Sequence, residues 1–456
     1  MPVSASREIS FEVLRRVEAE GAYASEALHA ELGANVKPAD AALATELTLG
    51  VLRWRRLLDF FIERQLKKPL ARLDLPVALA LRMGLYQLRF LARVPARAAV
   101  NESVELVKRA KISSAAALVN VILRRLAEQA RQPAAILLPP SLAPAERLAI
   151  LHSHPTWMVE RWLSRWGEAR TIQLLEANNR APRLSCVLHE PARQHEIFAK
   201  LEKDGLHIEP GCLLRSAFSV SGGSPSRTEA FRKGWISIQD EASQAIPLLL
   251  DVQVGDHVLD LCAAPGGKTA QLVRAAGEKG VVVAADHHAH RLRAMRDQFT
   301  RLGLRSITVI ELDATQPLPF KEKFQRILVD APCSGTGTLA RHPEIRWRLE
   351  PQQLAELHRL QVSMLANAVP NLSSGGWLVY STCSMEPEEN EEVVAELLRE
   401  VPSIRQVASG EAARALVGKL VPGVETDTLF NGSMQFCTFP GELPLDGFFS
   451  AIVAME

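Results

Sequence analysis

The first part of the chain carries apolar side chains at intervals of three and four residues, which is the pattern of amphipathic helices. Phe11, Leu14 and Val17 show this spacing, and runs of β-branched residues are almost absent up to about Gln129. Helices should end or begin at the residues that break helices: Gly33, Pro69, Pro76 and Pro95. The pattern predicts an all-α domain over residues 1–135.

A proline-rich stretch follows and cannot sustain a helix. Residues 132–144 contain prolines at 133, 139, 140 and 144, so we interpret this stretch as a linker between domains. A helical piece then opens near His154. Short strand-like runs surround a predicted helix over residues 197–204, up to about Gln239. The pattern predicts a small helical plus α/β subdomain over residues 145–235.

The last half of the chain alternates strands with helices. Strands are predicted at 258–261, 281–286, 306–313, 326–332 and 376–384, with helices that begin at Gly267 and end at Arg301 in between. Such alternation is typical of an α/β, doubly wound and mainly parallel sheet. Ligands bind such sheets at the carboxyl ends of the strands. We therefore expect the catalytic domain over residues 236–456.

The composition fits a folded protein of several domains. The 456 residues are 47% hydrophobic and 23% charged, and no run approaches the roughly 18 apolar residues of a membrane span. The first residues do not resemble a signal peptide, so we expect a cytoplasmic protein that does not act at a membrane. The six cysteines form no C-x-x-C pair, so neither a zinc site nor any other metal site is expected.

The charge is distributed unevenly along the chain. Residues 1–140 carry 21 Lys and Arg against 14 Asp and Glu, whereas residues 230–456 carry 21 against 28. A basic first domain suits the binding of an anionic polymer such as RNA. Solvated helix faces would explain the same surplus equally well.

A strand that runs into a turn of small residues and then a helix forms the first candidate site, DLCAAPGGKT at 260–269. Small side chains let a ligand approach the backbone, and the start of a helix offers free N–H groups. Asp286 ends the next strand, where an acidic side chain suits ribose hydroxyls, and Asp313 ends the third, where it suits an adenine amino group. The chain lacks the G-x-x-x-x-G-K-[ST] motif of triphosphate sites, so SAM fits better than ATP or NAD.

Two cysteines follow strands among small polar residues. Cys333 lies in DAPCSGTG after Asp330, and Cys383 lies in STCS. Free cysteines are usually inert core residues, which is our interpretation of Cys186, Cys212 and Cys437. The surroundings of Cys333 and Cys383 favour chemistry instead.

Two thiols and one carboxylate match the number of groups that methylation of cytosine at C5 requires. That carbon is a poor nucleophile until a thiolate adds to C6. A second group must then help to remove the C5 proton, and a carboxylate such as Asp330 can bond the N3 and N4 edge of the base.

The motifs together resemble those of the RNA 5-methylcytosine methyltransferases of the Fmu/Sun (RsmB-type) family. The similar segments of the last half are DLCAAPGGKT, DAPCSGTG with RHPEIRW, STCSMEPEEN, FRKGWISIQDEAS (231–243) and LPLDGFF (443–449). The first domain is similar to the NusB-like RNA-binding domain of this family in four segments: GVLRWRRLLD (50–59), LRMGLYQLRFLARVP (81–95), AVNESVELVK (99–108) and LVNVILRR (118–125).

The resemblance implies a fold, a reaction and the residues that carry it. It implies a Rossmann-like SAM-dependent methyltransferase domain that makes 5-methylcytosine in small-subunit (16S) rRNA, with Cys383 as the nucleophile and Cys333 as the group that aids release. Asp330 would act beside them. The implied SAM-binding positions are Cys262, Ala263, Ala264, Pro265, Gly266, Gly267, Lys268, Asp286, Asp313 and Asp330. The candidate RNA contacts are Arg53, Arg55, Arg56 and Lys108, although each could instead be a solvated helix residue.

Other functions remain open. The same reaction could act on tRNA, or the chain could be an RNA-binding assembly factor with a vestigial site. A small-molecule methyltransferase would need neither the basic helical domain nor the cysteine pair. The sequence departs from the family at its end, SAIVAME, and at HHAHRLRAM (287–295), which lacks an acidic residue after Asp286. No heptad run suggests a dimer, so we expect a monomer.

Overall fold

The computed structural model describes residues 3–33, 35–130 and 138–456, which form two compact units. Unit 1 comprises the described residues up to Arg180 together with Leu339–Leu349. Unit 2 comprises Ala181–Thr338 and Glu350–Glu456. Most of the predicted linker at 132–144 lies outside the described residues. The chain is helical again from Pro144.

Unit 1 is helical throughout, so the predicted all-α character of the first domain is confirmed. Gly33 follows α2, and Pro69, Pro76 and Pro95 stand at or next to the starts of η1, α5 and α6. These are the breaks that the sequence predicts. The helices of unit 1 are α1 (Ala5–Glu20), α2 (Ala24–Glu31), α3 (Pro38–Arg53), α4 (Arg55–Leu66), η1 (Leu70–Arg72), α5 (Leu75–Phe90), α6 (Ala96–Arg109), η2 (Ser113–Ala115), α7 (Ala116–Ala130), α8 (Pro144–Leu151), α9 (Thr156–Asn179) and α15 (Ile345–Arg348).

The helix α5 lies at the centre of unit 1, because it is apolar on nearly all sides and eleven of its residues are buried. It packs against α3 through a close approach at Gly50, where an added Cβ would lie 2.1 Å from the ring of Tyr86. Tyr86 stacks on Phe90, which stacks on Trp54. A larger residue at position 50 would therefore force these helices apart.

A short segment from the second half of the sequence completes unit 1. Leu339–Leu349 contains α15, and Arg346 on this helix is fully buried. Its guanidinium donates hydrogen bonds to the carbonyl oxygens of Arg53, Ser153, Asn178 and Leu339 and to Oδ1 of Asn179, at 3.0–3.3 Å. Burial lowers the pKa of Arg346 well below its ordinary value. Its acceptors offset this cost of burial.

Unit 2 begins with a small antiparallel sheet of four strands in the order β2-β3-β1-β4. Ile197 and Leu201 of α10 pack on Phe218 and Cys186 from the sheet. The predicted small α/β subdomain is therefore confirmed as a fold. Its elements are β1 (Leu184–Leu188), η3 (Pro191–Arg193), α10 (Gln194–Lys203), β2 (His207–Pro210), β3 (Ala217–Ser221), η4 (Pro225–Arg227), α11 (Glu229–Arg232) and β4 (Ile236–Ile238).

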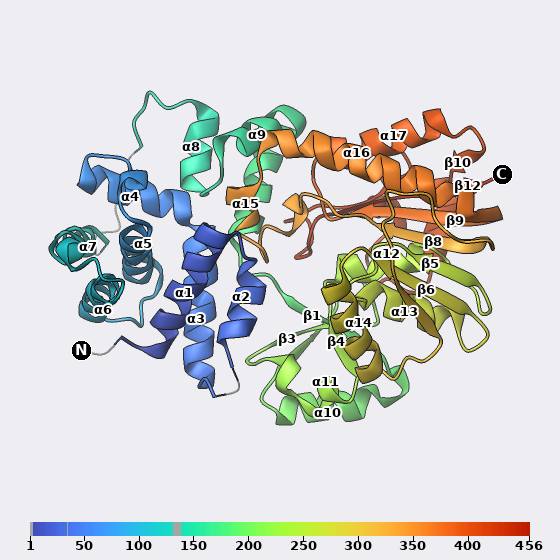
Figure 1. Ribbon diagram of the computed structural model, residues 1–456, viewed down its shortest axis with the longest axis horizontal. Coiled ribbons are helices and arrows are strands. Elements are labelled where there is room, and N and C mark those ends of the chain that lie inside the picture. Colours follow the sequence, from blue (N-terminus) through green and yellow to red (C-terminus); the bar gives the residue numbers. More distant parts are fainter. Residues whose placement is uncertain (1–2, 34, 131–137) are drawn as a thin grey trace. The chain divides into compact units, whose positions relative to one another are not determined.

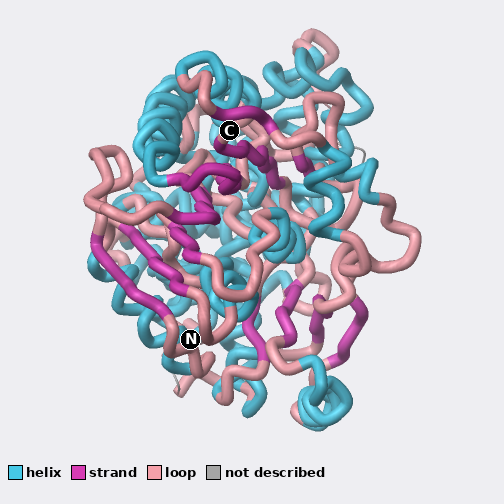
Figure 2. The backbone as a smooth tube through the Cα atoms, turned by 90° about the vertical axis from the view of Figure 1, so that its right-hand side faces the viewer, coloured by secondary structure: helices cyan, strands magenta, loops and turns pink. Residues whose placement is uncertain are grey.

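A second sheet, of eight strands, forms the rest of unit 2 in the order β10-β12-β9-β8-β5-β6-β7, with β11 paired to β12. Figure 2 shows the strands of both sheets in magenta. The five strands from β5 to β9 run parallel to one another, which confirms the predicted doubly wound α/β fold. They are β5 (His257–Asp260), β6 (Val281–Asp286), β7 (Ile307–Glu311), β8 (Phe324–Asp330) and β9 (Leu372–Thr382).

The sequence did not predict the last three strands, β10 (Ile404–Gln406), β11 (Phe436–Thr438) and β12 (Phe448–Met455). The strand β12 is antiparallel to β9, so the sheet is mixed at this edge. Seven of its eight residues are buried, and a strand that is buried on both faces does not show the alternation by which a strand is recognised.

Helices cover both faces of this sheet, as Figure 1 shows. Alternate strand residues point to opposite faces, so Val258 packs with α12 and α13 whereas Leu259 packs with α16 and α17. The helices around the sheet are α12 (Glu241–Leu249), α13 (Gly267–Ala276), α14 (Ala289–Arg301), η5 (Thr336–Thr338), α16 (Pro351–Ala368), η6 (Val369–Asn371), η7 (Pro387–Glu389), α17 (Glu391–Glu400), α18 (Ser409–Ala413), η8 (Arg414–Leu416) and η9 (Thr426–Leu429).

We predict that Arg346→Met destabilises unit 1. Methionine fills much of the volume but donates no hydrogen bond, so several buried acceptors lose their partner and the free energy of unfolding should fall by about 3 kcal/mol or more. Thermal unfolding followed by circular dichroism measures the change. The matched control is Arg348→Met on the same helix, where the side chain is exposed. Equal effects of the two substitutions would contradict the importance of the buried bonds.

Candidate active site

The turn after β5 places the first candidate residues at the carboxyl edge of the sheet. Asp260 ends β5, and α13 begins at Gly267. Gly266 has φ of 98°, in the left-handed region, and an added Cβ would lie 2.7 Å from the ring of Phe299. Glycine is therefore required at this position on both counts. The turn leaves the first N–H groups of α13 at the end of β5.

Asp260 is buried beneath this turn. Its Oδ2 accepts a hydrogen bond of 2.7 Å from Thr269 Oγ1, while its buried Oδ1 has no partner among the described residues. Burial raises the pKa of Asp260 to about 7. A buried acceptor without a donor beside free helix N–H groups is a feature expected of a ligand site.

The two predicted acidic residues farther along the sheet differ in their surroundings. Asp286 ends β6, is only 8% exposed, and accepts hydrogen bonds from the backbone N–H groups of Ala264 (3.2 Å) and His288 (3.0 Å). The structure thus joins Asp286 to the turn after β5. Asp313 does not end β7, as predicted, but lies two residues beyond its last residue, Glu311. Its carboxylate accepts from the hydroxyl and N–H of Thr315, and the hydroxyl bond lowers its pKa.

Asp330, at the end of β8, bonds to one residue from the segment after β5 and to one residue of β9, the two strands that neighbour β8. Lys268 Nζ lies 2.7 Å from Asp330 Oδ2, and Ser381 Oγ on β9 donates to Oδ1 at 2.6 Å. Lys268 also lies over the ring of Phe448, with 5.1 Å between Nζ and the ring centre. The side chain of Asp330 remains 28% exposed, so it can still be reached from solvent.

The two predicted catalytic cysteines lie side by side. The Sγ atoms of Cys333 and Cys383 are 3.3 Å apart, although 50 positions separate them in the sequence. Both side chains are partly exposed. The bond with the sulfur of Cys383, together with burial, raises the pKa of Cys333 well above its ordinary value. The pair therefore contains one thiol that holds its proton strongly.

The sequence did not point to Glu389, which joins the loops of these cysteines. Glu389 is fully buried and accepts hydrogen bonds from Ser334, the residue after Cys333, and from Ser384, the residue after Cys383. It lies in the motif STCSMEPEEN, where three glutamates occur close together. Glu386 is buried as well, so only the fold shows that Glu389 bonds to both cysteine loops.

The remaining cysteines lie elsewhere, and all six are free thiols. Burial raises the pKa of Cys186 to about 12, and Cys186 belongs to the core of the small subdomain. Cys212 and Cys437 are partly exposed and each packs against a hydrophobic cluster. Cys262, in the turn after β5, also packs against a cluster, and burial raises its pKa well above the ordinary value.

The candidate RNA contacts of unit 1 need correction. Arg53 is buried and donates to the carbonyl of Ala340 at 2.8 Å, so it supports the fold and is not available to RNA. Arg55 pairs with Glu18 at 3.0 Å, and Arg56 donates to the carbonyl of His154 at 3.0 Å. The apolar spacing in this part of the sequence predicts the helices α3 and α4. It does not show which arginines on them are covered by neighbouring segments.

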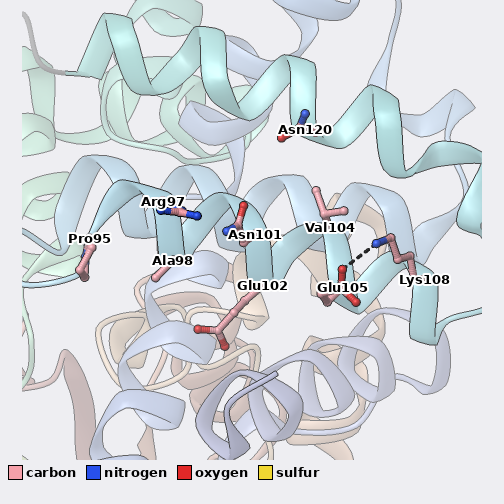
Figure 3. A pocket seen from close by; sticks show the side chains of 9 residues that line it. All are labelled: Pro95, Arg97, Ala98, Asn101, Glu102, Val104, Glu105, Lys108 and Asn120. Atoms are coloured by element: carbon pink, nitrogen blue, oxygen red, sulfur yellow. Dashed lines mark hydrogen bonds and ion pairs between the residues drawn. The ribbon is translucent and has the colours of Figure 1, made fainter. Parts of the chain in front are cut away.

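Lys108 alone of these four is exposed, and it lines a pocket of about 630 Å³ on α6 and α7 (Figure 3). Its Nζ lies 2.7 Å from Glu105 Oε1. The pocket mixes basic, acidic and amide groups, so Lys108 stays a predicted contact. The lining residues are Pro95, Arg97, Ala98, Asn101, Glu102, Val104, Glu105, Lys108 and Asn120.

Two further findings concern metals and membranes in the part of the chain that the structure describes. No group of three or more His, Cys, Asp or Glu residues there could hold a metal ion. No helix there combines the length and the apolar character that a membrane span requires.

The order of the strands gives the class of the protein. The strands β6 and β7 follow on one side of β5, whereas β8 and β9 lie on the other, and the candidate residues collect at the carboxyl ends on both sides of this switch. A mainly parallel sheet with helices on both faces and a switch of this kind defines a Rossmann-like domain, which a helical domain and a small α/β subdomain precede in the chain.

The chain belongs to the RsmB/F family of 16S rRNA methyltransferases. The sequence pattern of this family matches residues 247–454. Residues 4–128 match the NusB family, and residues 154–225 match the ferredoxin-like domain of RsmF/B-like methyltransferases. These matches confirm the resemblance on which the sequence interpretation rests.

Similar proteins cover nearly the whole chain. "Probable ribosomal RNA small subunit methyltransferase B" of Synechocystis is 34% identical over 87% of this chain and 89% of its own length. The protein of the same name from Bacillus subtilis is 32% identical over 98% of each chain. The crystal structure of PH0851 superposes with a TM-score of 0.81 at 23% identity, over 100% of this chain and 99% of that one, which supports the fold.

We predict that the stability of the protein depends on pH through Asp260. Its pKa of about 7 in the folded state lies above the ordinary value of about 4, so between these pH values the folded protein holds a proton that the unfolded chain releases. The stability from this neutral carboxyl is present at low pH and lost as the pH rises through about 7.

The variant Asp260→Asn stays neutral and should therefore exceed the wild type in free energy of unfolding by a few kcal/mol near pH 8.5, and by much less near pH 5. Thermal unfolding at both pH values measures the difference. Asp297→Asn, at an exposed position on α14, is the control and should show no such trend. A difference between wild type and Asp260→Asn that does not change with pH would refute the effect.

Proposed function

We propose that this protein is a SAM-dependent methyltransferase that forms 5-methylcytosine in small-subunit (16S) ribosomal RNA through a covalent bond between Cys383 and cytosine C6. The observation that carries the proposal is the distance of 3.3 Å between the sulfurs of Cys333 and Cys383, next to the carboxyl end of β8 where Asp330 lies. Methyl transfer to an ordinary nucleophile needs no thiol, whereas methylation at C5 needs one thiol to add and a further group to aid release.

Ribosomal RNA is the substrate that the relatives favour. The two relatives described above carry names that specify the small ribosomal subunit, and both align over most of their length. In this proposal residues 1–135 form the RNA-binding domain, residues 145–235 the small subdomain, and residues 236–456 the catalytic domain. The target base would leave its helix, since C5 and C6 must both be reached.

The residues around the turn after β5 fit SAM. The proposed binding positions are Cys262, Ala263, Ala264, Pro265, Gly266, Gly267, Lys268, Asp286, Asp313 and Asp330. When bound, SAM supplies an electrophilic methyl group on a sulfonium. The free N–H groups of α13 and the unpartnered Oδ1 of Asp260 suit the polar groups of such a ligand, and the carboxylate of Asp286 suits the ribose hydroxyls.

The covalent step proceeds in two stages. The thiolate of Cys383 gives its electron pair to C6, and the former C5=C6 pair makes C5 nucleophilic enough to attack the methyl group that bound SAM would supply. The carboxylate of Asp330 accepts from the N4 amino group, at the N3 and N4 edge of the base, and orients the ring for the addition. Lys268 and Ser381 hold the carboxylate of Asp330 for this role.

Release reverses the addition. The proton on C5 leaves to solvent water, its electron pair restores the C5=C6 bond, and the C6–S bond breaks to return the thiolate of Cys383, to which the thiol of Cys333 donates a hydrogen bond. Cys333 lies beside the departing sulfur and is the group that we assign to this stage. The net change is replacement of the C5 hydrogen by a methyl group, with loss of a proton.

We predict that Cys333→Ala traps the intermediate. The variant keeps the nucleophile but lacks the group that aids release, so incubation with SAM and 16S rRNA should accumulate a covalent complex that a denaturing gel shows as a shifted protein band. Cys383→Ala and the double variant should give no band and lose methylation by at least about 1,000-fold. Cys437→Ala, remote in sequence and packed on a core cluster, is the control.

The reverse pattern, with a band only in Cys383→Ala, would exchange the roles of the two cysteines. Absence of any band despite SAM binding, together with methylation that survives in Cys383→Ala, would refute the covalent mechanism. The same assay with tRNA in place of 16S rRNA distinguishes the two classes of substrate.

A separate prediction concerns the cofactor. Asp286→Ala removes the buried carboxylate that we assign to the ribose hydroxyls, so SAM should bind at least about tenfold more weakly, a loss typical of one charged hydrogen-bonding partner. Isothermal titration calorimetry measures the affinity. Asp297→Ala, at an exposed position, should bind like the wild type. Unchanged affinity in Asp286→Ala would remove the ribose role.

A further inference from the structure

The carboxylate of Glu389 is fully buried and is surrounded by hydrogen-bond donors. Glu389 ends η7, between β9 and α17. Its Oε1 accepts from the N–H of Ser334 at 2.8 Å and from Nε2 of Gln361 at 3.1 Å. Its Oε2 accepts from the hydroxyl of Ser384 at 2.5 Å and from the hydroxyl of Ser334. A charged carboxylate satisfies all of these contacts.

These contacts join the two cysteine loops at one point. Ser334 directly follows Cys333, and Ser384 directly follows Cys383, so each loop donates to the same carboxylate. Two backbone bonds add to this connection: Gly337 N–H donates to the carbonyl of Cys383 at 2.9 Å, and Met385 N–H donates to the hydroxyl oxygen of Thr336 at 2.8 Å. The spacing of the two sulfurs thus depends on Glu389 and its donors.

The charge of Glu389 also acts on the thiols. Burial raises the pKa of Glu389, while the hydrogen bonds from Ser334, Ser384 and Gln361 favour its charged form. For Cys333, the bond with Cys383 and burial raise the pKa, and the charges of Cys383 and Glu389 add to the same effect. A second negative charge close to a buried carboxylate is costly, so Cys333 retains its proton.

Two basic side chains nearby, Lys268 and His358, are engaged with partners of their own. Lys268 pairs with Asp330 and lies 5.1 Å from the ring of Phe448. His358 of α16 donates through Nδ1 to the carbonyl of Glu388 at 2.6 Å, and its Nε2 pairs with Glu396 at 2.9 Å. The titratable groups that act on Cys333 or Glu389 are Cys383, directly after β9, and Tyr380 of β9, whose hydroxyl donates to the carbonyl of Glu389.

We propose that Glu389 is a positioning residue that fixes the distance between the two cysteine loops, and that its negative charge keeps Cys333 in the thiol form while Cys383 reacts. This inference rests on the proposed function for its meaning in catalysis. The different roles of the two sulfurs then have a cause outside the cysteine pair. The buried carboxylate of Glu389 makes it unfavourable for both cysteines to be thiolates at the same time. The carboxylate does not touch the substrate.

The test measures the two thiols separately. Wild type and Glu389→Gln are treated briefly with iodoacetamide between about pH 6 and pH 10, and mass spectrometry follows the initial rate of labelling of each cysteine. Glutamine keeps the shape but loses the charge, so the pH midpoint for Cys333 should fall by about one unit or more. The midpoint for Cys383 should shift by less than half as much. Glu392→Gln, at an exposed position on α17, is the control.

Equal midpoints for Cys333 in wild type and Glu389→Gln would overturn the proposal. Circular dichroism and SAM affinity report whether the variant folds. If Glu389→Gln does not fold, Glu389→Asp decides, because aspartate keeps the charge and Cys333 should titrate as in the wild type. A fall of about one unit in the midpoint of Glu389→Asp would then overturn the role of the charge.

Turnover separates this inference from the proposed function. With SAM and 16S rRNA, Glu389→Gln should lose at least about tenfold in kcat while KM for RNA changes by less than about twofold, and Glu389→Asp should recover part of the loss. A drop in SAM affinity or a matching rise in KM would indicate a merely structural role. If the wild type forms no 5-methylcytosine, the proposed function fails, and the labelling midpoints still decide the role of Glu389.

Discussion

The parallel pairing of β8 with β9 is the constraint on which the site depends. In this register Asp330 stands opposite Ser381, so the residues that follow each strand leave the sheet at the same edge. Cys333 and Cys383 come within two or three positions of these partners and therefore meet, although they are distant in the sequence. The pairing of β5 with β8 adds the turn that carries Lys268 to the same edge. A slip of the β8–β9 register would separate the sulfurs and remove the Ser381 bond from Asp330.

Much of this arrangement could be predicted from the sequence, because parallel strands and their following turns obey local patterns. The apolar runs located the five parallel strands, and small residues after them located Asp260, Asp330 and the cysteines. The sequence could not show that Glu389 joins the two cysteine loops, since its donors Ser334 and Gln361 are distant in the sequence. It also misplaced Arg53 on a surface, because the segment that covers this side chain lies in the second half of the sequence.

Two buried charged groups illustrate how the fold offsets the free-energy cost of removing a charge from water. Arg346 in unit 1 and Glu389 in unit 2 are both removed from water, and each is surrounded by partners of complementary kind: oxygen acceptors around the guanidinium, and N–H and O–H donors around the carboxylate. A buried charge bonded by several partners favours one arrangement of the chain, because other arrangements leave it with fewer bonds. Here the restricted segments are the two that bracket η5: the loop of Cys333 before it and Leu339–Leu349 after it.

The place of Leu339–Leu349 in unit 1 has a consequence for biosynthesis. A ribosome releases the chain from its N-terminus, so the helices up to Arg180 emerge long before α15. Until Arg346 arrives, the carbonyl groups of Ser153 and Asn178 have no guanidinium to bind. The first unit therefore reaches its final form only after the strands β5 to β8 have been made. Unit 1 therefore completes its folding only while unit 2 is being translated. The two units cannot be exchanged between proteins as simple consecutive modules.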